Sequence, residues 1–206
     1  MRFKTAIHTI AITALFAALA NVCLAAQPII SFPDEYSVGD QPGLVPTPEE
    51  EQLPAEYRRQ MVFFRTSEQP GTIIVNTSER FLYLVQGDNR AIRYGIGVGR
   101  DGFQWHGLKY ISRKAEWPDW TPPPEMIARQ PYLPRFMAGG PGNPLGARAL
   151  YIGGTVYRIH GTNQPRTIGS AVSSGCFRLT NPEVADLYER VPVGTRVVVL
   201  QPPNLQ

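Results

Sequence analysis

The chain has 206 residues, which suits one domain with short extensions, and 43% of them are hydrophobic, so most of the chain can bury a core. Only 18% are charged, and the formal net charge of +3 comes without a run of Lys or Arg, which excludes a typical nucleic-acid-binding protein. The 19 Gly and 20 Pro favour turns and short strands over long helices.

Residues 1–26 have the pattern of a secretion signal. The basic residues Arg2 and Lys4 precede an apolar run over residues 10–19, and small residues follow it. We therefore expect cleavage near the end of this segment and no stable membrane span afterwards. Two alternatives stay open: a retained membrane anchor, for which the apolar run is short, and a lipoprotein signal at Cys23.

Cleavage would change both the charge and the cysteine count. Without Arg2 and Lys4, 18 Lys and Arg stand against 17 Asp and Glu, a net charge of +1. Without Cys23, the mature chain keeps Cys176 alone. Such a cysteine forms an intermolecular bridge, acts as a reactive thiol, or packs as a small hydrophobic residue, and its neighbours must decide.

Residues 27–70 are expected to form an extended leader or linker. Pro and acidic residues are frequent there, and no apolar period is sustained. The apolar run Val62 to Phe64, near its end, predicts a short element that packs on the following domain.

Residues 71–201 have the pattern of a mainly β domain, followed by a tail at 202–206. Apolar runs rich in β-branched and aromatic residues alternate with Gly, Asp and Asn turns, which predicts a β-meander or β-sandwich with one or two short helices. The expected strands lie at residues 71–77, 80–86, 91–100, 108–114, 147–153, 156–161 and 195–201.

Residues 117–148 interrupt these strands with too many Pro and Gly for a sheet. We expect an irregular excursion with one helical turn at 124–129. Loops of this length in compact domains usually bind something or form a lid, and a variable surface loop is the alternative. Four aromatic residues argue against full solvation: Trp117, Trp120, Tyr132 and Phe136.

The sequence pattern after residue 180 predicts a helix. Asn181 is predicted as its N-cap, Pro182 as its first residue, and Glu183 suits the positive first turn. Gly194 lies beyond the expected end. One face repeats apolar residues at the helical period: Val184, Leu187, Tyr188 and Val191.

Candidate catalytic residues gather just before this helix. His160 ends a predicted strand, and an imidazole there could take the thiol proton of Cys176 and later return it to a leaving amine. Arg178 could hold a substrate carboxylate or raise the local positive potential. Gly175 permits close backbone approach, and the amides from Ser174 to Cys176 could bind an oxyanion.

Structural roles remain open for the same residues. His160 could only hydrogen-bond, Cys176 could belong to the core, and Arg178 could pair with an acid of the helix. A zinc site of His106, His160 and Cys176 is a weaker alternative, because these ligands are scattered and lack a paired motif.

The stretch HGTN…SSGCFRLTNPEVADLY closely resembles the signature of the L,D-transpeptidase catalytic domain, the YkuD-like (ErfK/YbiS) family. The resemblance implies that Cys176 is the nucleophile, His160 the general base, and the Gly161 carbonyl the group that orients the imidazole. It also implies that Arg178 lines the site and that Ser173 opens the cysteine motif.

The resemblance, which extends over roughly residues 71–200, implies a periplasmic acyltransferase that acts on peptidoglycan stem peptides without a cofactor or metal. The thiolate attacks the third residue, D-Ala leaves, and an amine takes the acyl group. The product would be a 3→3 cross-link or a peptidoglycan-anchored outer-membrane protein or lipoprotein. Carbapenems are expected to acylate the same cysteine.

The chain departs from the family pattern in two ways. Many members have Ser-His-Gly-Cys, and Ser174 replaces that His here, which puts any contact of a second imidazole in doubt. The family's usual peptidoglycan-binding module is not apparent. The alternatives are a carboxypeptidase or amidase that transfers to water, a non-catalytic wall-binding protein, and a redox thiol that lacks a resolving partner.

Overall fold

The computed structural model describes residues 41–200. The predicted signal peptide with Cys23, the first part of the predicted leader and the C-terminal tail lie outside the described residues. Within residues 41–200, no helix has the length and apolar character needed to cross a membrane.

The described residues form short strands with few helices, so the prediction of a mainly β fold is confirmed. The helical elements are η1 (Ala55–Tyr57), α1 (Pro124–Arg129), η2 (Pro165–Thr167) and α2 (Asn181–Arg190). The strands are β1 (Gln60–Phe63), β2 (Ile73–Asn76), β3 (Phe81–Gly87), β4 (Arg90–Gly95), β5 (Val98–Gly99), β6 (Gly107–Glu116), β7 (Arg148–Ile152), β8 (Arg158–His160), β9 (Ala171–Ser173), β10 (Phe177–Arg178) and β11 (Arg196–Leu200).

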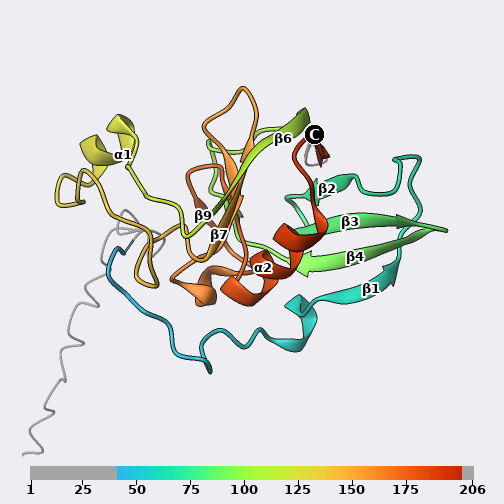
Figure 1. Cartoon of the computed structure of the whole chain (residues 1–206), viewed down its shortest axis with the longest axis horizontal. Coiled ribbons are helices and arrows are strands. Elements are labelled where there is room, and N and C mark those ends of the chain that lie inside the picture. The colour runs from blue at the N-terminus through green and yellow to red at the C-terminus, as the bar shows by residue number, and fades with distance from the viewer. Residues whose placement is uncertain (1–40, 201–206) are drawn as a thin grey trace, which may run out of the picture. The chain divides into compact units, whose positions relative to one another are not determined.

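Nine of these strands form one mixed sheet in the order β1-β4-β3-β2-β11-β6-β7-β8-β10, and β5 pairs with β9. The antiparallel run β2-β3-β4 is the predicted meander. Strand β6 joins the two halves, because its first residues pair with β11 and the rest pair with β7. Figure 1 shows β1, β3 and β4 well away from the segment that carries α1.

The segment predicted as a leader contributes strand β1, which pairs antiparallel with β4. Next to it, Phe64 stacks on Tyr83 with ring centroids 4.2 Å apart, and Val62 packs on the same small cluster. Phe63 is 71% exposed and takes no part. The apolar run therefore packs on the domain through two of its three residues.

Helix α2 departs from the prediction at its start. Thr180 is the N-cap residue, and Asn181 lies in the first turn, so the predicted N-cap was wrong. The Asn181 side chain accepts a hydrogen bond from the Ala147 amide and donates one to Glu51 Oε1, each 2.8 Å long. The prediction failed because the Asn181 side chain binds partners distant in sequence instead of its own helix.

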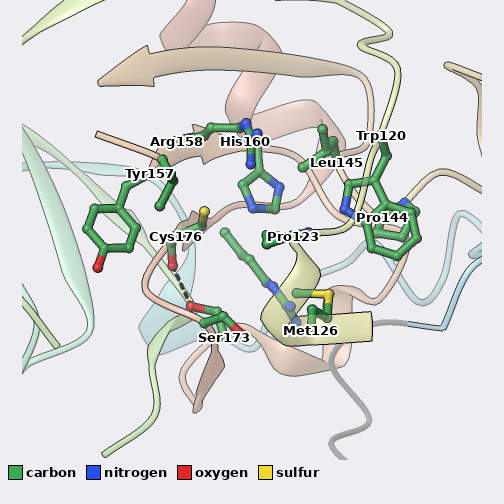
Figure 2. A pocket seen from close by; sticks show the side chains of 13 residues that line it. Trp120, Pro123, Met126, Pro144, Leu145, Tyr157, Arg158, His160, Ser173 and Cys176 are labelled. Atoms are coloured by element: carbon green, nitrogen blue, oxygen red, sulfur yellow. Dashed lines mark hydrogen bonds between the residues drawn. The ribbon is translucent and has the colours of Figure 1, made fainter. Parts of the chain in front are cut away.

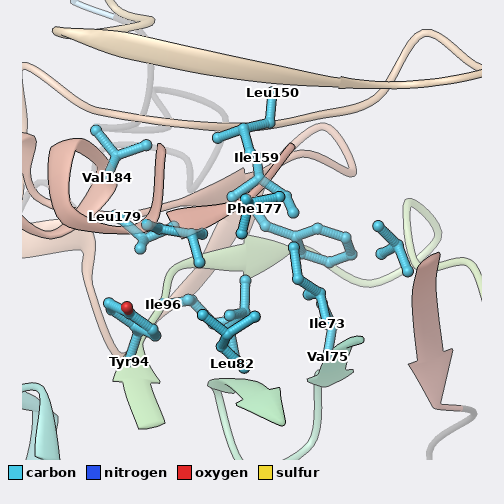
Figure 3. Close-up of a cluster of buried hydrophobic side chains, with 14 of the residues drawn as sticks. Ile73, Val75, Leu82, Tyr94, Ile96, Leu150, Ile159, Phe177, Leu179 and Val184 are labelled. Carbon is cyan, nitrogen blue, oxygen red and sulfur yellow. The ribbon is translucent and has the colours of Figure 1, made fainter. Parts of the chain in front are cut away.

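The main core packs side chains from both halves of the sheet together with those of α2 (Figure 3). Val184 and Leu187, from the predicted face of the helix, are fully buried in it. Each such side chain stabilises the fold by about 1.5–3 kcal/mol. Ile159 of β8 and Phe177 of β10 also point into this core (Figure 3), and they fix which way the neighbouring residues of both strands point.

The excursion over residues 117–148 has a small core of its own. Helix α1 forms at the predicted residues, and it packs Met126 with Trp120 and two leucines that are also buried. Among the four aromatic residues, Trp120 is buried, whereas three are exposed: Trp117, Tyr132 and Phe136. The excursion is therefore an ordered unit.

A buried asparagine closes this unit. The Asn143 side chain is fully buried, and its amide nitrogen donates to the carbonyl oxygens of Pro118, at 3.2 Å, and Ala138, at 3.0 Å. Its amide oxygen accepts from the Leu145 amide at 2.9 Å. One side chain thus joins the beginning and end of the excursion.

Residues 41–54, called the strap below, cross the loops next to β8. Asn163 Nδ2 donates to the Gln41 carbonyl oxygen at 2.7 Å, and Arg166 forms an ion pair with Glu50 at 3.0 Å. The bond between the strap and α2 described above adds a third anchor. The strap therefore lies against both segments that flank the end of β8.

Candidate active site

Strands β8 and β10 bring the predicted site residues together. They pair in parallel with Arg178 opposite His160, and the same register, continued one residue before β10, places Cys176 beside Arg158. Side chains alternate along a strand, so these four point to one face while the residues between them enter the core. The pairing of these two short strands therefore brings the four side chains together, although they come from two separate segments of the sequence.

All four side chains line one narrow pocket with a volume of about 60 Å³. Figure 2 shows the His160 ring and the Cys176 side chain at this pocket. One wall comes from the excursion and consists of Trp120, Pro123, Met126, Pro144 and Leu145. The remaining lining residues are Val156, Tyr157, Ser173 and Ser174.

The His160 ring is buried and held in one orientation. Its Nδ1 lies 2.5 Å from the Gly161 carbonyl oxygen, so Nδ1 carries the proton and Nε2 keeps its lone pair. Burial lowers its pKa to about 3, aided by the charges of Arg178 and Arg158 and opposed by backbone hydrogen bonds at Gly161 and Leu145. The ring is therefore neutral at neutral pH and can accept a proton at Nε2.

Steric contacts require a glycine at position 161, directly after this histidine. A Cβ at this position would lie 2.5 Å from Asn181 Oδ1 and 3.0 Å from the Ala147 nitrogen. Only a residue without a side chain lets the first turn of α2 approach so closely. The start of α2 therefore packs closely against the residue whose carbonyl oxygen holds His160.

The turn before Cys176 also requires glycine. Gly175 has φ of +103°, and a Cβ there would collide with the Tyr157 ring and lie 3.0 Å from the Phe103 carbonyl oxygen. The Gly175 carbonyl accepts a hydrogen bond from Trp105 Nε1 at 3.0 Å, and Trp105 stacks on Tyr157. Cys176 itself is half-buried.

Ser173 shapes this turn from inside. Its hydroxyl donates to the Cys176 carbonyl oxygen at 2.6 Å, drawn in Figure 2, and accepts from the Gly175 amide at 3.2 Å. Ser173 is almost fully buried. In this structure Ser173 and the Gly175 amide therefore bind each other, and the roles predicted for them toward the substrate stay predictions.

Ser174 is half-buried and lines the pocket at the position of the family's second histidine. Arg178 is buried and lines the same pocket. Sequence reasoning missed Arg158 and Tyr157 as residues of the site. The alternation along the predicted strand could have found Arg158, which lies two residues before His160.

The described residues do not form a metal site. In the part of the chain from 41 to 200, no three His, Cys, Asp or Glu side chains are grouped so that they could hold a metal ion. The zinc alternative, which needed His106 beside His160 and Cys176, is contradicted.

Known proteins resemble this chain over most of the described residues. A family model for the L,D-transpeptidase catalytic domain, YkuD, matches residues 70–199. The probable L,D-transpeptidase ErfK/SrfK of Escherichia coli (strain K12) is 41% identical over 138 residues, which are 64% of this chain and 44% of that protein. The chain thus spans less than half the length of this relative.

Solved structures are also similar. The avibactam carbamoyl enzyme of Ldtfm has a TM-score of 0.53 at 18% identity, covers 66% of this chain and 51% of its own, and supports the fold alone. A Brucella melitensis structure described as a probable carnitine operon oxidoreductase is 51% identical, with a TM-score of 0.48. It covers 72% of this chain and 96% of its own, and its TM-score is too low to support an argument.

Proposed function

The chain belongs to the L,D-transpeptidase catalytic domain family, and from this premise we propose that it is a secreted, periplasmic acyltransferase of peptidoglycan stem peptides with Cys176 as nucleophile. The observation that carries the proposal is the shared pocket of Cys176 and a neutral His160 whose Nδ1 is held by Gly161. That arrangement leaves the basic nitrogen of the ring for the thiol proton.

The first half of the reaction forms a thioester. The Cys176 sulfur attacks the carbonyl carbon of the third stem residue while its proton passes to His160 Nε2. The tetrahedral oxyanion collapses, the C–N bond breaks, and the D-Ala amine leaves with the proton from His160. Backbone amides at Ser174 and Cys176 are the candidates for stabilising the oxyanion.

The second half returns the enzyme to its starting state. An acceptor amine attacks the thioester carbonyl, its proton passes to His160, and the sulfur leaves as thiolate and regains that proton. A stem-peptide side chain as acceptor gives a 3→3 cross-link, and a lysine of an outer-membrane protein or lipoprotein gives an anchored protein. Water gives a carboxypeptidase, the second candidate, because the same two residues serve every acceptor.

The excursion is proposed to act as the lid of a peptide groove. It supplies one wall of the pocket through Trp120 and Met126 and is closed on itself by Asn143. A wall of this kind limits the water that competes with the acceptor amine for the thioester.

The test is incubation of the mature protein with a disaccharide-tetrapeptide, beside Cys176→Ala, followed by intact mass spectrometry and product analysis. We expect an acyl adduct, loss of D-Ala and a cross-linked dimer, all absent from Cys176→Ala. The variant should keep its near-ultraviolet circular dichroism, because Ala replaces one small group. A carbapenem should acylate the wild type alone.

Release of D-Ala with tripeptide as the only product would establish the carboxypeptidase instead. Neither adduct nor product, with Cys176 alkylated by iodoacetamide no faster than a model thiol, would contradict an enzyme and leave a structural thiol.

A further inference from the structure

Arg158 is a cation in the pocket that the reaction above does not use. It points to the same face as Cys176 and lies beside it in the register of the strand pair, whereas Arg178 lies beside His160. A substrate whose carbonyl reaches the sulfur is therefore within reach of the Arg158 side chain. The position of Arg158 is fixed by the pairing of β8 with β10.

Arg158 has no acidic partner among the residues that the structure describes. The described residues that line the pocket supply two guanidinium groups and no carboxylate. Arg158 takes part in none of the ion pairs formed between residues 41 and 200, and its Nε is buried without a hydrogen-bond partner among them. A buried donor on a cation is stabilised by an anionic acceptor, which a substrate can bring.

Packing alone does not account for this arginine. The Arg158 guanidinium lies 5.4 Å from the centre of the Tyr151 ring, but Arg113 lies closer to that ring, at 3.7 Å. The ring thus already has a cation on it, supplied by β6. Arg113 does not line the pocket, so it provides a matched control for the loss of charge and of ring contact.

We propose that Arg158 binds a carboxylate of the donor peptide next to the bond that Cys176 cleaves. The identity of that peptide rests on the proposed function. Two of its carboxylates lie near the bond: the α-carboxylate of the terminal D-Ala, and the side-chain carboxylate of the third residue where that residue is diaminopimelate. The planar guanidinium can bind either with two parallel hydrogen bonds.

The first experiment needs no peptide. Iodoacetate and iodoacetamide both alkylate Cys176: the thiol proton passes to His160 Nε2, the S–C bond forms, the C–I bond breaks, and iodide leaves with the electron pair. Only iodoacetate carries a carboxylate. We expect the rate ratio of iodoacetate to iodoacetamide to fall about 10-fold or more in Arg158→Gln, to fall less in Arg158→Lys, and to stay unchanged in Arg113→Gln.

An equal rate ratio in the wild type and Arg158→Gln would overturn the proposal. An equal fall in Arg158→Gln and Arg113→Gln would also overturn it, since it would reflect the general field of a positive charge and no binding site.

The second experiment identifies the carboxylate. Three substrates are compared: the tetrapeptide, its C-terminal amide, and the tetrapeptide amidated on the side chain of the third residue. We expect Arg158→Gln to lower kcat/KM by about 10- to 100-fold on the tetrapeptide and to have no effect on the analogue that lacks the bound carboxylate. An equal loss on all three substrates would overturn carboxylate binding.

The two failures are distinguishable. Peptides that the wild type leaves untouched would contradict the proposed function, and the alkylation ratio would still decide the assignment of Arg158. Peptide turnover with no effect of Arg158→Gln would contradict the assignment and leave the function standing.

Discussion

At the scale of single residues, the glycine before the nucleophile combines two constraints. Gly175 adopts a backbone conformation that other residues rarely reach, and its missing side chain leaves room for Tyr157. The first constraint costs an alanine roughly 1–2 kcal/mol, and the second costs a further roughly 1–3 kcal/mol through overpacking.

Gly175→Ala should therefore destabilise the fold by about 2–5 kcal/mol and slow alkylation of Cys176, because the turn that presents the sulfur must shift. Gly154→Ala is the matched control: Gly154 has φ of +69° with open space around its Cβ position, so only the backbone cost applies. Urea unfolding and iodoacetamide rates measure both effects. Equal losses in the two variants would contradict the steric argument at Gly175.

The buried His160 predicts how stability depends on pH. Its folded pKa of about 3 lies below its ordinary value of 6.5, so the unfolded chain binds a proton that the folded protein excludes. Stability should fall as the pH falls from 6.5 towards 3. Relative to pH 7, the part due to His160 at pH 4.5 is on the order of 2 kcal/mol.

Urea midpoints at pH 7 and pH 4.5 check this expectation against His160→Gln, which carries no charge at either pH. The loss between the two pH values should be smaller in the variant than in the wild type. The carboxylates that titrate in the same range are common to both proteins and cancel. An identical loss would show that the imidazole is protonated in the folded state.

The chemistry of single residues was easier to predict than their contacts. Cys176 and His160 stand out because a thiol and an imidazole share one motif, and that depends on residue type alone. The role of Asn181 was misjudged, because its side chain binds Ala147 and Glu51, which lie far from it in the sequence. Which polar group a buried serine or asparagine chooses is decided by tertiary packing.

At the scale of elements, the longer strands and both helices could be predicted, because they are long enough to show a period. Strands β9 and β10 have only three and two residues, so no alternation can reveal them. Yet β10 sets the register that puts Cys176 beside Arg158. The face on which Arg158 lies follows from alternation along its own strand, but its pairing beside Cys176 depends on β10, which is too short to carry a pattern.

The excursion offers a test at this scale. Trp120→Ala should loosen residues 117–148 while leaving the main core in place, because Trp120 belongs to a separate buried cluster. A buried Trp replaced by Ala costs roughly 3–5 kcal/mol, enough to open a local unit. Limited proteolysis should then cut within the excursion, and iodoacetamide should reach Cys176 faster.

Tyr132→Ala is the matched control, since Tyr132 belongs to the same excursion and is 65% exposed. It should leave both proteolysis and alkylation unchanged. Protection of the excursion in Trp120→Ala equal to that in the wild type would show that its order does not depend on this small core.

At the scale of the whole described chain, the site and its surroundings combine segments that lie far apart in the sequence. The excursion supplies one wall, β8 and β10 supply the reacting side chains, and the strap crosses the loops beside them. The pattern of residues 71–201 could indicate the first two. The strap could not be predicted, because its composition resembles a linker and its anchors are single polar contacts.

The strap lies before the residues that the family model matches, which begin at 70. It binds Asn163, two residues after Gly161, and Asn181, whose Oδ1 would lie 2.5 Å from a Cβ at Gly161. The part of the chain that the family model matches is therefore smaller than the part that packs around the site. A fragment cut at the homology boundary would keep every reacting group, yet it would lose the bonds of the strap to the two asparagines that stand closest in the chain to His160 and to the start of α2.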